Sequence, residues 1–105
     1  MASKYELARL AVSDLKEIWA YIAENNIKAA DRLIDEFARK FHLLAQNPTI
    51  GRDQSDYIVG MRVFPYKKYI IYYFPTDSGV EIYRVLHGAR DIKDLFEEFF
   101  EGLEP

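Results

Sequence analysis

The chain has 105 residues, of which 50% are hydrophobic and 30% charged, and its formal net charge is −3 at pH 7. This length predicts one domain over residues 1–105, and the apolar content is too high for intrinsic disorder. The absence of cysteine excludes disulfide scaffolds and thiol catalysis, and the two histidines cannot form a closed zinc site without carboxylates. We expect no metal and no cofactor.

The charge is unevenly distributed along the chain. Residues 1–51 contain seven basic and seven acidic residues, residues 52–90 contain six and four, and residues 91–105 contain one and six. A basic excess this small does not predict sequence-specific binding of nucleic acid. No apolar run approaches membrane-spanning length, and the first residues lack the apolar core of a signal peptide, so we expect a cytoplasmic protein.

A short strand and an amphipathic helix are expected first. Residues 5–10 alternate weakly between apolar and polar side chains, which indicates a strand. Ser13 is a candidate N-cap for a helix over about residues 13–24. One face of this helix carries Leu15, Ile18, Trp19 and Ile22.

A second amphipathic helix follows the break at Asn25-Asn26 and ends at Asn47-Pro48. Its apolar stripe consists of Ala30, Leu33, Ile34, Phe37, Phe41 and Leu44. The short connection predicts that the two helices pack antiparallel as a hairpin, with Trp19, Phe37 and Phe41 buried.

Three strands are expected next, at residues 61–64, 69–74 and 80–86, separated by turns at 65–68 and 75–79. Consecutive strands with short turns form an antiparallel meander. In the middle strand Tyr69, Ile71 and Tyr73 point to one face and Ile70, Tyr72 and Phe74 to the other. Neither face is polar, and a helix hairpin covers only one of them.

The last expected element is an acidic helix over residues 91–101, with Asp91 as its N-cap. Its apolar face carries Ile92, Leu95, Phe96, Phe99 and Leu103. The helix either covers part of the second sheet face or meets a partner, and the sequence leaves both open. The fold class is α+β: an N-terminal strand, an antiparallel helix hairpin packed on a small antiparallel β-sheet, and a short C-terminal helix.

Five segments, residues 11–22, 44–52, 60–62, 69–73 and 82–91, resemble in order and spacing the RelE/ParE toxins of type II toxin–antitoxin systems. The last of them contains the run Arg-Val-Leu-His-Gly-Ala-Arg-Asp and looks more like the ParE branch than the RelE branch. The resemblance implies a plasmid-stabilization toxin that poisons DNA gyrase. It also implies a ParD-like antitoxin whose disordered C-terminal segment folds over the toxin. A homodimer or a toxin–antitoxin hetero-oligomer stays open.

RelE-type activity would instead imply ribosome-dependent cleavage of mRNA, which requires an acid, a base and cations for the charge that builds on phosphorus. The candidate set is His87, Arg62, Arg84, Arg90 and Tyr83. His87 has no carboxylate at a motif spacing to orient it, and a histidine at a strand end usually caps backbone or packs. We therefore predict a protein-binding inhibitor rather than an endoribonuclease. A non-toxic orphan that keeps only an interaction role remains the third alternative.

The surplus of apolar surface independently predicts a protein partner. The candidate partner-binding residues are Arg62, Tyr72, Phe74, Arg84, Arg90, Phe96 and Phe99. We expect the antitoxin arm in a groove between Tyr72 and Phe74 and the outer side of Ile34 and Phe41. Arg84 either pairs with Glu81 or Asp91 or faces the partner.

One glycine is predicted to have a conformational role in a loop. Gly51 follows Asn47-Pro48 and precedes Arg52, and the spacing indicates a turn that requires a positive φ.

Overall fold

A computed structural model describes residues 4–90 and 92–101, apart from the side chains of Ile92 and Phe96. The elements in chain order are β1 (Lys4–Leu7), α1 (Arg9–Ala23), α2 (Ile27–Gln46), β2 (Arg52–Asp53), β3 (Arg62–Tyr66), β4 (Tyr69–Thr76), β5 (Gly79–His87) and α3 (Ile92–Glu101). The strands lie in the order β1-β5-β4-β3-β2. None of the helices in these described ranges is long and apolar enough to span a membrane.

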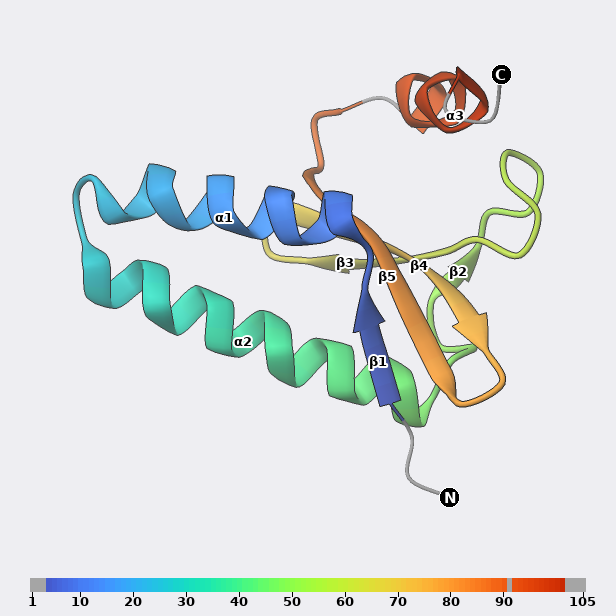
Figure 1. Ribbon diagram of the computed structural model, residues 1–105, viewed down its shortest axis with the longest axis horizontal. Helices are drawn as coiled ribbons and strands as arrows, with labels where there is room; N and C mark the ends of the chain where they lie inside the picture. Colours follow the sequence, from blue (N-terminus) through green and yellow to red (C-terminus); the bar gives the residue numbers. More distant parts are fainter. Residues whose placement is uncertain (1–3, 91, 102–105) are drawn as a thin grey trace.

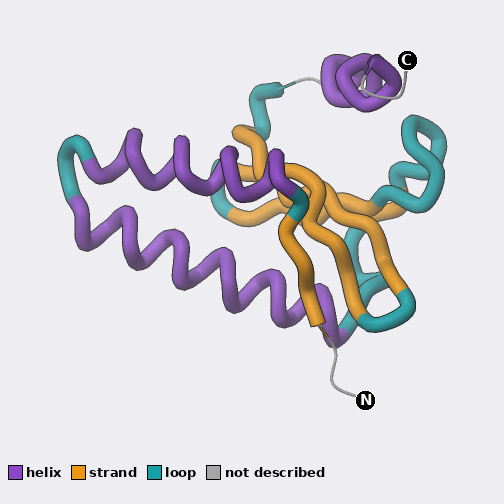
Figure 2. Tube along the Cα trace, viewed as in Figure 1, coloured by secondary structure: helices purple, strands orange, loops and turns teal. Residues whose placement is uncertain are grey.

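The helices form layers on the two faces of the sheet. The hairpin of α1 and α2 runs antiparallel and packs against the sheet, while α3 lies apart from the hairpin and follows β5 in the chain (Figures 1 and 2). The predicted antiparallel meander of β3, β4 and β5 is confirmed. Two pairings were not predicted: β1 runs parallel to β5, and β2 pairs with Arg62 and Val63 of β3.

The start of the first helix differs from the prediction. β1 ends at Leu7 and α1 begins at Arg9, so Leu10 is helical and Ser13 lies inside the helix. The N-cap is Ala8, whose N–H donates to Ile82 O at 2.9 Å and whose carbonyl accepts from Val12 N–H. This link to β5 turns the chain from strand to helix without a side-chain cap, so the predicted N-cap role of Ser13 is wrong.

The second helix has the predicted limits. Asn26 caps it, because the side-chain Oδ1 accepts from Ala29 N–H at 3.0 Å. Phe37 and Phe41 are fully or almost fully buried, as predicted. Trp19 is not: it is 37% exposed, and its Nε1 donates to Asp31 at 2.8 Å. The indole N–H needs a polar partner, which Trp19 finds at the solvent side of the two helices.

The strands extend into both predicted turns. Pro65 belongs to β3 and Pro75 to β4, so the turns shrink to Lys67-Lys68, with Lys67 at φ 54°, and Asp77-Ser78. At Pro65, β3 has passed the end of β2 and pairs with β4 alone. Proline is tolerated there because its missing N–H faces no strand.

The two faces of β4 alternate as predicted. Ile71 and Tyr73 lie in the core beneath the hairpin, and Ile70, Tyr72 and Phe74 lie in the core on the second face. The open question about the tail helix is decided by Leu95, which is fully buried in this second core. α3 therefore covers part of the second sheet face.

Candidate partner-binding surface

Arg84 of β5 forms ion pairs with residues of both α1 and α3 inside the fold. Its side chain is buried, with 6% of the residue exposed, and forms a bidentate pair with Asp14 at 2.8 and 2.9 Å. Its third nitrogen donates to Glu98 of α3 at 2.8 Å. The predicted partner Glu81 is wrong, and Asp91 lies outside the described residues, as does its predicted N-cap role. The hydrogen bonds to Asp14 raise the pKa of the Arg84 guanidinium, although burial lowers it.

Asp14 is the residue of this site that the sequence analysis missed. Beside Arg84 it accepts from Val85 N–H at 3.0 Å, at the part of β5 that extends past the end of β1. The Asp14 carboxylate thus supplies Val85 N–H with the acceptor that a neighbouring strand would otherwise provide, and it neutralises the buried Arg84 cation. An acidic residue on the apolar face of α1, three residues after Ala11 and four before Ile18, was the signal in the sequence.

Arg62 is likewise used inside the fold. Its Nη1 donates to Gly51 O at 2.7 Å and to Thr49 O at 3.2 Å, which holds the loop before β2. Tyr73 OH donates to Pro48 O and accepts from Gly51 N–H. The positive φ predicted for Gly51 is wrong. A Cβ at Gly51 would lie 2.5 Å from the Tyr73 hydroxyl, so glycine is needed for close approach and not for a left-handed turn.

The residues proposed for RNA cleavage do not converge. His87 of β5 lies opposite Tyr69, the first residue of β4, whereas Arg62 of β3 lies opposite Tyr73 in the middle of β4 and on its other side. Four residues of strand separate these positions by about 13 Å. His87 Nδ1 accepts from Ala89 N–H at 3.1 Å, so this histidine caps backbone.

Tyr83 and Arg90, the remaining candidates for RNA cleavage, also have structural contacts of their own. The ring of Tyr83 packs edge-on against two others, with its centroid 5.8 Å from that of Phe74 and 5.7 Å from that of Phe99. Burial raises the pKa of the Tyr83 phenol. Arg90 lies 3.2 Å from Glu98 of α3.

The predicted antitoxin groove is wrong. Tyr72 and Phe74 belong to the second core, whereas Ile34 and Phe41 belong to the first, and the sheet separates the two. Tyr72 is 3% exposed and Phe41 is buried. Phe74 and Phe99 are half-buried in contact with each other, and the side chain of Phe96 lies outside the described residues.

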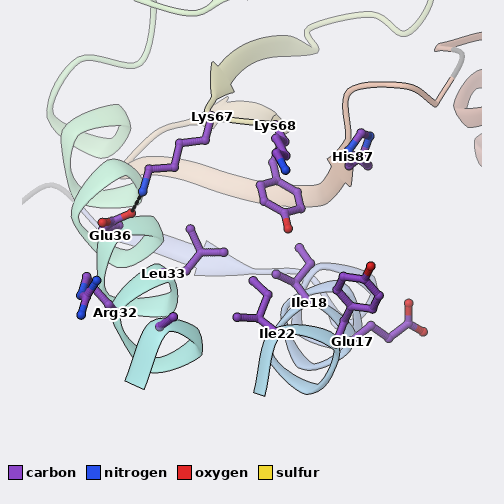
Figure 3. Close-up of a pocket in the computed structure, with 12 residues that line it drawn as sticks. Glu17, Ile18, Ile22, Arg32, Leu33, Glu36, Lys67, Lys68 and His87 are labelled. Carbon is purple, nitrogen blue, oxygen red and sulfur yellow. Dashed lines mark hydrogen bonds and ion pairs between the residues drawn. The ribbon is translucent and has the colours of Figure 1, made fainter. Parts of the chain in front are cut away.

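A different groove opens between the helix hairpin and the β3–β4 turn (Figure 3). Its volume is about 640 Å³. Apolar side chains from both helices line it, among them Ile18, Ile22 and Leu33, together with Tyr69 of β4. Tyr21, 76% exposed, stands at the edge.

Charged side chains surround this hairpin groove: Glu17, Arg32, Glu36, Lys67 and Lys68, with His87 beside them (Figure 3). Glu36 accepts from Lys67 Nζ and from Tyr66 OH, both at 2.7 Å. These bonds lower the pKa of Glu36 and raise the pKa of Lys67, so both are charged at neutral pH. In the described part of the chain, Arg32 and Lys68 form no ion pair, which leaves the rim beside α2 and the turn positive.

Comparison with known proteins points to one family. A family model for the ParE toxin of type II toxin–antitoxin systems, parDE, matches residues 5–92. Toxin ParE3 of Caulobacter vibrioides is 32% identical over 80 residues, which cover 75% of this chain and 80% of that protein. Toxin ParE1 of Mycobacterium tuberculosis is 29% identical over 94 residues, 88% and 96% of the two chains. The solved "Chromosomal ParDE TA system from P. aeruginosa" shares the fold, with a TM-score of 0.67 at 18% identity, covering 83% of this chain and 96% of that one.

Proposed function

The chain belongs to the family of ParE toxins of type II toxin–antitoxin systems, and we propose that it binds and poisons DNA gyrase and is neutralised by a ParD-like antitoxin. Such a target lies in the cytoplasm, the location that the sequence predicts. The observation that carries the choice of a protein-binding mechanism is the dispersal of His87, Arg62 and Arg84.

This dispersal argues against RNA cleavage. A general base must lie within hydrogen-bond reach of the proton that it removes, and the cations must surround the same phosphate. His87 and Arg62 lie on opposite sides of β4, beside positions four residues apart along it, and Arg84 is buried against Asp14. An inhibitor that acts by binding needs none of these groups together.

The test is expression in a bacterium followed by measurements of DNA damage and translation. We expect filamentation and double-strand breaks while translation continues, and the purified chain should trap gyrase on cleaved DNA. His87→Ala should keep at least about half of this activity, because the contacts of His87, a cap on Ala89 N–H and edge-on packing against Tyr69, are structural. If His87→Ala lowers an RNA-cleavage rate by about 100-fold or more, the ribonuclease alternative is correct. A chain that neither harms cells nor affects gyrase would be the non-toxic orphan.

For the antitoxin we propose the hairpin groove as the binding site. Its floor is apolar, through Ile18, Ile22 and Leu33, and suits the apolar side chains of an amphipathic segment. Arg32 and Lys68 at the rim suit acidic side chains on that segment. A disordered arm that folds into the groove would give a large negative heat-capacity change on binding.

Charge reversal at the rim tests this placement. Lys68→Glu should weaken binding of the antitoxin encoded beside the toxin about tenfold or more, because a like charge then faces the acidic arm. The matched control is Lys4→Glu, which makes the same charge change beside Gly79, at the far end of β5 from His87. Isothermal titration calorimetry measures both affinities. Equal weakening by the two variants would mean that the arm binds elsewhere.

A further inference from the structure

A second cavity lies on the sheet face that carries α3. Its volume is about 340 Å³, which falls in the range of small-ligand sites. Val63, Ile70 and Tyr72 of β3 and β4 line it. α3 packs over Phe74, further along β4, through the contact of Phe99 with Phe74. The cavity therefore occupies the stretch of this face from Ile70 to Tyr72.

Two arginines line this cavity from different elements. Arg52 comes from β2 at the edge of the sheet, and Arg90 comes from the segment that leaves β5. The arginines nearby have internal roles: Arg62 holds two carbonyls and Arg84 is buried on Asp14. Across residues 4–90 and 92–101, the Arg52 side chain forms no hydrogen bond or ion pair.

Arg90 is available for a ligand at small cost. Its pair with Glu98 measures 3.2 Å, and the side chains are 39% and 38% exposed. Exposed ion pairs of this kind contribute little. Glu98 also accepts from Arg84 at 2.8 Å, so it keeps a buried cationic partner when Arg90 turns away.

The chemistry of the lining selects the ligand class. Guanidinium groups bind phosphate through paired N–H donors, and the apolar floor suits the flat body of a base. Gln54 at the edge carries an amide that both donates and accepts hydrogen bonds. We propose that this cavity binds a nucleotide, with its phosphate held by Arg52 and Arg90 and its nucleoside against Val63 and Ile70. The nucleotide is either free or an unpaired unit of a single strand.

This inference goes beyond inhibition of gyrase and does not rest on it. It agrees with the expectation that the chain has no sequence-specific binding to nucleic acid, because phosphate contacts carry no sequence information. The net charge of −3 further disfavours a long polyanion and favours a contact confined to one or a few nucleotides.

The experiment is a titration of the ¹⁵N-labelled full-length chain, followed by amide NMR shifts, with ATP, with an eight-nucleotide oligo-dT strand and with a hexaglutamate peptide. We expect saturable shifts at Arg52, Gln54 and Arg90. Arg52→Ala should weaken the binding at least tenfold. The control Arg39→Ala removes the same charge from the exposed side of α2 and should leave the binding unchanged. The thermal midpoints of both variants verify that they fold.

Each outcome decides the proposal. Saturation by both ATP and the oligonucleotide supports a site for any nucleotide phosphate, and saturation by the oligonucleotide alone supports nucleic acid as the source. Saturation by hexaglutamate alone would replace the proposal with a site for acidic protein segments. Shifts that never saturate, or equal weakening by Arg52→Ala and Arg39→Ala, would overturn it.

Discussion

Replacing Asp14 with alanine is expected to lower the free energy of unfolding by about 3–5 kcal/mol, because one partner of a buried ion pair is removed and the other stays buried. Three donors lose their acceptor at once: Arg84 Nε, Arg84 Nη2 and Val85 N–H. Glu98 remains beside Arg84 but is itself partly exposed. Urea unfolding monitored by the fluorescence of Trp19, the one tryptophan of the chain, measures this loss.

The matched control for Asp14→Ala is Glu17→Ala. Glu17 lies one turn further along α1 and is exposed, so its removal should change the free energy of unfolding by no more than about 0.5 kcal/mol. The double variant Asp14→Leu/Arg84→Met should recover part of the loss, since apolar side chains of similar size often replace buried ion pairs without cost. A loss below about 1 kcal/mol in Asp14→Ala would show that the pair does not tie α1 to β5.

The second large effect is expected from Phe37→Ala, at about 3–5 kcal/mol. Phe37 is fully buried, stacks on Phe41 with ring centroids 6.1 Å apart, and meets Tyr66 and Tyr69 edge-on at 5.9 and 5.5 Å. Its removal leaves a cavity where α2 meets the sheet. Thermal and urea unfolding both measure the change.

Leu43→Ala on the same helix serves as the control, because Leu43 is among the exposed apolar residues. It should cost well under half as much as Phe37→Ala. Phe37→Ala should also weaken antitoxin binding, because Phe37 packs against Tyr69, which forms part of the hairpin groove. Equal losses from the two variants would contradict the placement of the core.

Much of the fold was predictable because it depends on local periodicity. The apolar stripe of residues 27–46 repeats every three or four positions, and Asn26 and Asn47 mark its ends, so the α2 limits were predicted correctly. The alternation along β4 has a period of two, which assigned its side chains to the correct faces. The ordered motifs predicted the family, which the family model confirms.

The candidate sites were predictable only in part. Arg84 and His87 were singled out, but their neighbours were not: Asp14 lies 70 positions from Arg84, and no motif spacing connects them. The predicted groove combined residues from opposite sides of the sheet, because residue identity does not show which face another helix covers. The hairpin groove and the Arg52–Arg90 cavity each join segments that are distant in the sequence.

The sequence by itself therefore determined the kinds and order of the elements other than β2, most of the buried apolar side chains and the toxin family. Only the tertiary structure decided the parallel pairing of β1 with β5, the burial of Arg84 on Asp14 and the half-exposed position of Trp19. The physical reason is the range of the forces involved. Periodicity and capping act between residues a few positions apart, whereas strand pairing, ion pairing and burial depend on which distant segments the packed core brings together.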